Sequence, residues 1–430
     1  MKKRVLVITY YWPPSGGAGV QRWLKFAKYL PQNGWQPVIY TPENPEIPVV
    51  DDSLVKDIPS EAEIVRTRIW EPYEWYKLFT GRRGERINTG FLNEKGKGGA
   101  TEKISVWLRG NLFIPDARKF WIKPSIKYLL EYLEKNPVDA IVSSGPPHSM
   151  HLIALGLKKK LNVKWVADFR DPWTNIDFYH ELRLTKHSDK KHRSLEKEVL
   201  KYADEVITIG KTLSEEMAAI GSRKVNVITN GYDASDLQND AVDTDMKFSI
   251  SHIGTLSKSR NPVQLWKALA ELVKEEKLFA DSLEIKLAGK VDFHIKQSLN
   301  ECGLEKHVHY IDYIPHDEVA KLQQQSQVLL LILNDTPNAK GILTGKLFEY
   351  MAALRPILCI GRRDGDAAVI INETKCGEVC EYADHEKMKE TVKKYFNRYK
   401  EGTLASSAQF IEQYSRAALT KDLVTLLNKN

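Results

Sequence analysis

Residues 4–41 read RVLVITYYWPPSGGAGVQRWLKFAKYLPQNGWQPVIYT, and this stretch decides the fold. Residues 4–9 are β-rich and almost wholly apolar, as expected of a strand that is covered on both faces. After a loop rich in proline and glycine, apolar residues recur at helical spacing from Val20 to Leu30. Residues 36–41 have the composition of a second strand. A strand, a helix and a strand in this order predict a parallel sheet with a right-handed crossover.

The alternation of strands and helices continues along the chain in two series. In the first half we predict further strands at residues 140–143, 164–168, 205–209 and 226–229. In the second half we predict strands at residues 248–253, 283–288, 307–311, 328–333, 356–360 and 378–380. Two such series predict an α/β protein with two doubly wound, Rossmann-like domains. Ligands bind at the carboxyl ends of parallel strands, so the expected site is a central cleft that the two domains face.

The domain boundaries follow from changes in composition. A polar, acidic stretch at residues 233–245 separates the two series. It predicts a first domain at residues 1–235 and a second at residues 246–405. Residues 43–124 are turn-rich, aromatic and basic, and we interpret them as a long insertion with some helix. Residues 406–430 are predicted to end the chain with a helix that packs back on the first domain.

The overall composition is that of an ordinary globular protein. With 430 residues, 42 % hydrophobic and 28 % charged, the chain is not of the disordered, collagen-like or coiled-coil type. Its longest apolar runs are far shorter than the roughly 20 residues that span a bilayer. Four cysteines in 430 residues indicate a reducing compartment rather than a disulfide framework. We therefore expect a cytoplasmic protein without a targeting segment.

The net charge is mildly positive, with 63 basic residues against 56 acidic ones, a balance of +7. This excess is well below the concentrated stripe of a nucleic-acid-binding protein, so no nucleic acid partner is predicted. Residues 77–123 nevertheless hold eleven Lys or Arg and four Asp or Glu, interleaved with aromatic residues. We interpret this segment either as a solvated insertion or as a surface that meets an anionic lipid headgroup or an anionic acceptor.

The loop after the first strand contains Ser15-Gly16-Gly17-Ala18-Gly19. It places unhindered backbone N–H groups at a helix N-terminus, where an anion or phosphate is stabilised. The loop does not have the Gly-x-Gly-x-x-Gly spacing, and strand two does not end in an acidic residue, so a nicotinamide cofactor is not expected. A tight strand-to-helix turn explains the same glycines without a ligand.

The second half contains the stronger motif, residues 341–357, which read GILTGKLFEYMAALRPI. A loop at Thr344 and Gly345 leads into a helix whose first turn offers free N–H groups beside Lys346. Such a helix start suits a diphosphate, and the Glu349 carboxylate one turn later suits a ribose diol. The alternative interpretation is an amphipathic core helix with a solvated Lys and Glu.

Taken together, these segments resemble the retaining, nucleotide-sugar-dependent glycosyltransferases of family 4, which have the GT-B double-Rossmann fold. The resemblance covers essentially the whole chain. KLFEYMA at residues 346–352 is its most specific part. The other matching segments are YYWPPSGGAGV at 10–20, ITNGYD at 228–233, HIGTLSKSRNP at 252–262 and IDYIPHDEV at 311–319.

The resemblance implies a set of donor-binding residues. Glu349 matches the second Glu of the family's Glu-x7-Glu and would bind the ribose, whereas Gly341 stands in place of the first Glu. Arg260 matches a family Lys, and Thr255 stands where the family has an Arg. We expect Lys346 and the backbone of Thr344 and Gly345 to substitute for that lost cation at the diphosphate. The base-contacting loop corresponds to Tyr313 and Ile314, and Gly16 and Gly17 would let donor phosphate or acceptor approach the backbone.

Candidate residues in the first domain follow two strand ends. His148 lies in the loop SSGPPHSMH at 143–151 and is predicted to face the cleft as a catalytic residue, together with Arg260 and Lys346. Arg170 and Asp171 follow the strand at 164–168 and are candidates for acceptor binding. The alternative interpretation is that Arg170 pairs with an aspartate and braces its loop.

Two Asp-x-Asp sequences, Asp243-Thr-Asp245 and Asp364-Gly-Asp366, lie in a linker and a strand-to-helix loop, and we assign them no metal. No cofactor is expected besides a nucleoside diphosphate sugar as co-substrate. The predicted function is hexosyl transfer to a glycan or lipid-linked acceptor, as in bacterial surface polysaccharide synthesis, with peripheral contact to an anionic membrane. The alternatives are a nucleotide-sugar epimerase of the same fold and a non-catalytic nucleotide-sugar-binding partner.

Overall fold

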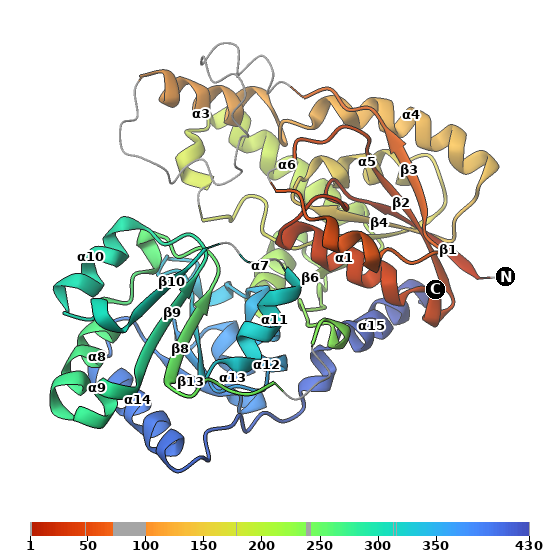
Figure 1. Ribbon diagram of the computed structural model, residues 1–430. Helices are drawn as coiled ribbons and strands as arrows, with labels where there is room; N and C mark the ends of the chain where they lie inside the picture. The colour runs from red at the N-terminus through yellow and green to blue at the C-terminus, as the bar shows by residue number, and fades with distance from the viewer. Residues whose placement is uncertain are drawn as a thin grey trace. The chain divides into compact units, whose positions relative to one another are not determined.

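The computed structural model describes residues 2–47, 49–71, 100–177, 179–237, 242–312, 314 and 316–429 (Figure 1). The chain divides into two compact units. The first comprises Met1–Thr229 and Leu419–Asn430, and the second comprises Asn230–Ala418. Each unit is built on one parallel sheet. The prediction of two parallel, Rossmann-like α/β domains is confirmed.

The first sheet has seven strands in the order β3-β2-β1-β4-β5-β6-β7. Their bounds are β1 Lys3–Ile8, β2 Trp35–Pro42, β3 Glu63–Thr67, β4 Ala140–Gly145, β5 Lys164–Phe169, β6 Glu205–Thr208 and β7 Asn226–Val227. The central strand β1 pairs in parallel with β2 on one side and β4 on the other, and Val5 is the partner of both Pro37 and Ala140. Six of these seven strands lie within two residues of the predicted positions.

Helices cover both faces of this sheet. They are α1 Ala18–Tyr29, α3 Ala100–Leu112, α4 Lys119–Lys135, α5 Ser149–Lys158, α6 Lys186–Tyr202 and α7 Lys211–Gly221. Alternate residues of β1 enter opposite cores: Leu6 and Ile8 pack in one, and Val5 and Val7 in the other. Both cores exclude water, which explains why residues 5–8 of the strand are all apolar.

The C-terminal helix α15, Arg416–Asn428, contributes to the second of these cores. Leu419 and Leu423 are buried with residues of α1 and β1, and Lys3 Nζ donates to Asn428 Oδ1 at 2.8 Å. The last residues of the chain therefore complete the apolar face of the first unit.

One strand lies inside the segment that we interpreted as an insertion. Glu63–Thr67 forms β3, which pairs with β2 at the edge of the sheet, and Val38 is the partner of Glu63. The insertion interpretation was wrong for these residues. The physical reason is that an edge strand needs few apolar residues, and of the five residues of β3 only Val65 is buried. Residues 72–99 of the same segment lie outside the described residues.

The second unit contains a six-stranded parallel sheet in the order β10-β9-β8-β11-β12-β13. Its strands are β8 Phe248–Ile253, β9 Leu283–Ala288, β10 Val308–Ile311, β11 Val328–Ile332, β12 Ile357–Ile360 and β13 Gly377–Cys380. Its helices are α8 Val263–Glu275, α9 Lys277–Ser282, α10 Phe293–Glu301, α11 His316–Gln325, α12 Gly345–Ala352, α13 Asp366–Thr374 and α14 His385–Lys400. Strands β8 and β9 have the predicted bounds, and the other four differ by one residue.

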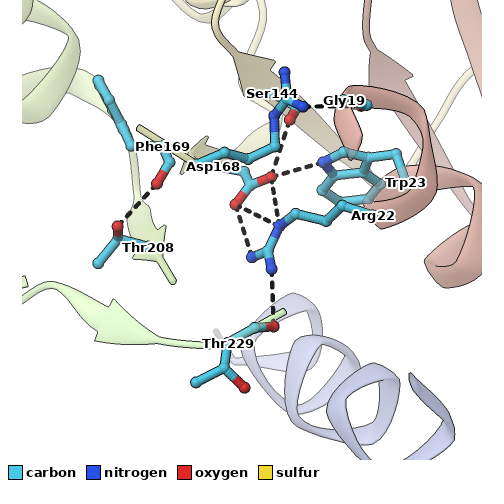
Figure 2. A network of polar contacts seen from close by, with 9 residues as sticks. Gly19, Arg22, Trp23, Ser144, Asp168, Phe169, Thr208 and Thr229 are labelled. Carbon is cyan, nitrogen blue, oxygen red and sulfur yellow. Dashed lines mark hydrogen bonds and ion pairs between the residues drawn. The ribbon is translucent and has the colours of Figure 1, made fainter. Parts of the chain in front are cut away.

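A buried charge pair fixes α1 to the sheet of the first unit (Figure 2). Arg22 of α1 and Asp168 of β5 are 1 % and 0 % exposed, and Nη2 of Arg22 lies 2.9 Å from Oδ1 of Asp168. The carboxylate also accepts hydrogen bonds from Trp23 Nε1 at 2.7 Å and from Ser144 Oγ at 3.0 Å. Nη1 of Arg22 donates to the carbonyl of Thr229 at 2.9 Å. Burial raises the pKa of Asp168, but the charge and hydrogen bonds of Arg22 outweigh it and hold that pKa below its usual value.

Replacing Asp168 by Asn should destabilise the first unit by about 3–5 kcal/mol, because Arg22 is then a buried charge without its counter-ion. Urea unfolding followed by tryptophan fluorescence measures this loss. The matched control is Asp189→Asn, which breaks the exposed pair with Arg193 and should cost about 1 kcal/mol or less. The low pKa of Asp168 adds stability at neutral pH that is lost as the pH falls through the folded-state pKa, so the effect of D168N should shrink in acid. Equal losses of stability in the two variants would contradict the assignment of Arg22 and Asp168 as a buried ion pair that stabilises the first unit.

Candidate functional site

The start of α12 in the second unit gathers most of the predicted donor-binding residues. Thr344 is the N-cap of this helix, but its hydroxyl makes no capping hydrogen bond. Its Oγ1 is buried and has no hydrogen-bond partner among the described residues. The N–H groups of Gly345 and Lys346 have no intrahelical acceptor either, whereas that of Leu347 donates to the carbonyl of Thr344 at 3.3 Å. The helix therefore begins with unused donors and an unused hydroxyl.

Lys346 lies in this first turn, and its amine sits directly over Gly254. A Cβ atom added to Gly254 would lie 2.2 Å from Nζ of Lys346. Gly254 follows β8 and has a φ of +126°, a backbone conformation that other residues rarely adopt. The glycine at the carboxyl end of β8 therefore makes room for the amine. Within the described part of the chain, Lys346 makes no hydrogen bond or ion pair.

The surroundings of Lys346 disfavour its positive charge, as expected of a cation whose partner is a bound anion. Burial and, to a smaller extent, the positive charge of Arg260 lower its pKa to about 8, against the opposing effect of Glu349. Arg260 lies in the loop after β8, and its Nε donates to the amide oxygen of Asn334. Buried cations normally have a carboxylate partner, so the Lys346 amine is an exception that a bound anion would resolve.

Two buried side chains that the sequence analysis did not single out hold this corner in place. The hydroxyl of Tyr350 accepts the backbone N–H of Ile253 at 2.9 Å, which joins α12 to the end of β8. Nδ1 of His252 lies 3.0 Å from the carbonyl oxygen of Leu330 on the neighbouring strand. Burial, together with the charges of Lys346 and Arg260, lowers the pKa of His252 to about 3, so its ring is neutral. Both residues stand in the segments that carry the family resemblance, but only the fold shows that they support Lys346.

Glu349 lies one turn after Gly345, and its Oε1 is 3.9 Å from where a Cβ of Gly345 would be. Its Oε2 accepts from Nε2 of Gln323 at 3.4 Å. Glu349 and Gln323 line a small pocket with Tyr232 and Asp233. A half-buried carboxylate beside a pocket can accept hydrogen bonds from a pair of hydroxyl groups.

The remaining donor candidates are distributed as follows. Thr255 is exposed and follows Gly254 directly, and Ile314 is half-buried in the segment after β10. Tyr313 lies outside the described residues. The structure therefore brings Thr344, Gly345, Lys346 and Glu349 together on one helical turn, with Arg260 and Gly254 beside it.

The glycine loop of the first unit has less free backbone than expected. The N–H of Gly16 donates to the carbonyl of Val49 at 2.8 Å, so this donor is already used. Gly17 is the N-cap of α1 with a φ of +92°, and a Cβ added there would meet nothing within 4 Å. Gly17 is thus the member of the pair that leaves space for a ligand.

His148 and His151 both lie against Gly145 at the end of β4. A Cβ on Gly145 would be 2.6 Å from Nε2 of His151 and 3.0 Å from Nδ1 of His148. His151 is fully buried and its Nδ1 is 2.8 Å from Oγ of Ser143, which agrees with a packing role. His148 stacks on Trp173 with ring centroids 4.6 Å apart, and its buried Nδ1 has no partner among the described residues. Burial lowers the pKa of His148 well below its usual value, so the ring is neutral.

Arg170 and Asp171 differ in their surroundings. The guanidinium of Arg170 donates to the carbonyl of Gly19 at 2.8 Å and to the carbonyl of Pro146, which braces two loops against each other. Asp171 is exposed at the end of the same loop. This geometry favours the bracing interpretation for Arg170 and leaves Asp171 open to solvent.

The two Asp-x-Asp sequences carry carboxylates that are already paired. Asp245 lies 2.8 Å from Nζ of Lys286, and Asp364 forms two hydrogen bonds with the guanidinium of Arg362. Neither pattern presents two free carboxylates to a common point. We accordingly assign no metal to either.

Two family models match the chain over adjoining residues. Residues 236–413 match "Glycosyl transferases group 1", and residues 93–236 match "Glycosyltransferase Family 4". A search of curated protein sequences gives no match.

Several solved structures share the fold over nearly the whole chain. Sucrose-phosphate synthase from Thermosynechococcus elongatus is 12 % identical, with a TM-score of 0.64 over 99 % of this chain and 98 % of that one. WaaG, a glycosyltransferase involved in lipopolysaccharide biosynthesis, is 13 % identical, with a TM-score of 0.56 over 99 % and 100 %. A variant of S. aureus TarM in complex with Fondaparinux, alpha-GlcNAc-glycerol and UDP is 11 % identical, with a TM-score of 0.58 over 99 % and 100 %.

Replacing Gly254 by Ala should displace the Lys346 amine and weaken anion binding. Calorimetry with inorganic pyrophosphate measures this, and we expect at least a tenfold lower affinity, because a charge-assisted contact is worth about 1.5–3 kcal/mol. Gly303→Ala is the matched control, since Gly303 also has a positive φ of +71° but no atom within 4 Å of an added Cβ. Equal pyrophosphate affinity in the two variants would show that Lys346 does not hold the anion.

Proposed function

We propose that this glycosyltransferase of the GT-B fold moves a hexosyl group from a nucleoside diphosphate sugar to an acceptor hydroxyl, with retention of configuration and without a metal. The observation that carries the proposal is the Lys346 amine, which lies over Gly254 at the start of α12 without a described partner. A diphosphate is the anion that such a site suits, because free N–H groups of a helix start and the amine belong to the same turn.

The donor would be held along one turn of α12. In this proposal the diphosphate meets Lys346, Arg260, the Thr344 hydroxyl and the N–H groups of the first turn. The ribose meets Glu349, whose carboxylate borders the pocket with Tyr232. Tyr313 and Ile314 are proposed to meet the base. UDP in the TarM complex makes a uridine nucleotide the first choice of probe.

The same groups would promote cleavage of the donor. The bond between the anomeric carbon and the diphosphate oxygen breaks, and the oxygen keeps the electron pair. Fixed cations and helix N–H groups stabilise that negative charge without having to reorganise. The acceptor oxygen bonds to the anomeric carbon on the same face, and its proton passes to the leaving phosphate oxygen. This route needs neither a protein nucleophile nor a divalent ion.

The first unit is proposed to receive the acceptor. His148 presents a neutral ring at the end of β4, and Asp171 is exposed after β5. Gly17 leaves space at the start of α1. We further propose a glycan or lipid-linked acceptor in surface polysaccharide synthesis, a choice prompted by the involvement of WaaG in lipopolysaccharide biosynthesis, and peripheral contact to an anionic membrane on the cytoplasmic side.

Analysis of the products formed from a panel of nucleotide sugars tests this proposal against its two alternatives. A transferase without acceptor should slowly release free sugar and nucleoside diphosphate, and this should persist in excess EDTA. An epimerase should return an epimerised sugar, and a non-catalytic binding partner should return the donor unchanged. Either of the last two results would overturn the transferase, and a loss of activity in EDTA that Mn²⁺ restores would overturn metal independence.

The Lys346 pKa of about 8 predicts a pH dependence of nucleotide binding. Only the protonated amine attracts the diphosphate, so affinity should be highest below pH 8 and fall as the pH rises. At pH 9 about a tenth of the amines remain charged, which predicts a roughly tenfold loss of UDP affinity relative to pH 7. Lys346→Arg keeps its charge over this range, so its affinity should change little with pH. Parallel pH profiles for the two proteins, measured by calorimetry, would exclude Lys346 as the titrating group.

A further inference from the structure

A buried amide side chain on α11 holds one oxygen of the Glu349 carboxylate. Gln323 is only 3 % exposed, and its Nε2 donates to Oε2 of Glu349 at 3.4 Å. The nitrogen of the amide must face this oxygen, because an ionised carboxylate only accepts hydrogen bonds. Within the described part of the chain, the carboxylate accepts no other hydrogen bond. Gln323 is therefore the residue that determines how Glu349 is oriented.

The two oxygens of the Glu349 carboxylate have different neighbours. Oε2 faces Gln323, whereas Oε1 lies 3.9 Å from the place where a Cβ of Gly345 would be, beside the start of α12. A glutamate side chain has several rotatable bonds and loses entropy when it is ordered. A hydrogen bond to Oε2 limits that rotation without occupying Oε1. This leaves Oε1 available next to the helical turn that we propose for the diphosphate.

The end of α11 is attached to the sheet, so Gln323 is itself held in place. Ser326, three residues after Gln323, is fully buried, and its Oγ lies 2.7 Å from Oγ of Ser251 on β8. The backbone N–H of Gln327 donates to Oγ of Ser249 on the same strand at 2.8 Å. Hydrogen bonds between buried groups are strengthened by the low dielectric constant around them. They fix the helix to β8 one turn away from the amide.

The pocket beside Glu349 suits a neutral hydroxyl group better than a phosphate. Asp233 and Asp236 line it together with Glu349 and Gln323, beside apolar side chains of α11 and α12. The carboxylates would repel a phosphate placed there, whereas a hydroxyl group can donate a hydrogen bond to them. Apolar walls limit the access of water, which strengthens such a hydrogen bond.

We propose that Gln323 is a positioning residue, which orients Glu349 for the ribose hydroxyls and thereby sets a preference for ribonucleotides over 2′-deoxyribonucleotides. The inference rests on the proposed function, because it takes Glu349 as the residue that binds the ribose. The amide does not touch the nucleotide. It orders the carboxylate before the ligand arrives, so less entropy is lost on binding. A 2′-deoxyribose offers this carboxylate one hydroxyl fewer, so its nucleotide should bind more weakly.

Calorimetry of the full chain with UDP, its 2′-deoxy analogue and inorganic pyrophosphate tests the proposal; ADP or GDP, each with its 2′-deoxy analogue, replaces UDP if UDP does not bind. The unmodified protein should bind the ribonucleotide roughly tenfold more tightly than the deoxyribonucleotide, because a hydrogen bond to a charged group is lost. Gln323→Met keeps the length of the side chain but removes its donor. It should lower this preference about fivefold, the worth of one typical hydrogen bond. The affinity for pyrophosphate, which lacks a ribose, should not change.

Two further variants guard against an effect on folding. Gln323→Asn keeps an amide but shortens the side chain by one carbon, so it should lower the preference in the same direction as Gln323→Met. Gln325→Met is the matched control, because Gln325 is half-buried two residues later on α11 and its side chain forms no hydrogen bond among the described residues. It should leave all three affinities unchanged.

A double variant tests whether Gln323 acts through Glu349. Glu349→Gln alone should also lower the preference for the ribonucleotide. Adding Gln323→Met to it should lower the preference no further, because both changes remove the same interaction. Additive losses would overturn the proposal, since they would place Gln323 in contact with the ribose itself.

The possible outcomes separate this inference from the proposed function. If the ribonucleotide binds but Gln323→Met keeps the full preference for it, the inference is wrong and the proposed function stands. If Gln323→Met weakens the ribonucleotide, the deoxyribonucleotide and pyrophosphate equally, Gln323 has only a structural role, and the inference is again overturned. Failure of UDP, ADP and GDP alike to bind the unmodified protein would overturn the proposed function and this inference with it.

Discussion

A buried carboxylate that must be neutralised organises the first unit. Asp168 is fully buried at the end of β5, and leaving its charge unpaired there would cost more than a typical fold can tolerate. Its partners come from two elements of the chain: Arg22 and Trp23 on α1, and Ser144 on β4. Arg22 in turn reaches the carbonyl of Thr229, at the end of the first stretch of this unit. One charge therefore determines where α1 begins relative to the carboxyl ends of the strands, and with it the position of the glycine loop.

In the second unit, the backbone conformation of two glycines at the carboxyl ends of strands makes room for the candidate site. Gly254 and Gly289 follow neighbouring strands and both have positive φ angles, and a Cβ on Gly289 would lie 3.1 Å from the backbone of Gly254. Because neither glycine carries a side chain, the loops after β8 and β9 approach closely and leave space for the Lys346 amine. The absence of a side chain on Gly254 thus permits the long side chain of Lys346, from α12, to lie over the end of β8.

The sequence was sufficient for most of the fold because both sheets are buried on both faces. Apolar runs such as residues 328–333 can be read directly, whereas the edge strand β3 has a single buried residue and left no comparable pattern. The motif around Lys346 and Glu349 was visible as a helix start, but its contact with Gly254 joins residues 92 positions apart and requires the sheet order. For Gly16 the sequence predicted a backbone N–H that is available to a ligand. In the structure this N–H donates to the carbonyl of Val49, a residue that no local sequence pattern connects to the loop.

The cations of the structural framework differ from the cation of the candidate site in whether they have a carboxylate partner. Arg22, Lys25 and Arg118 of the first unit are buried, and each faces a carboxylate within 3 Å. Lys346 is also largely removed from water, yet its neighbouring cation is Arg260 and its pKa falls to about 8. An arrangement that opposes protonation of its own amine lowers the stability of the empty protein. Such an arrangement is retained where a ligand offsets this loss of stability. A bound anion supplies the opposite charge that the Lys346 amine lacks in the free protein. The same feature that makes Lys346 unfavourable in the free chain is therefore what makes it suited to a diphosphate.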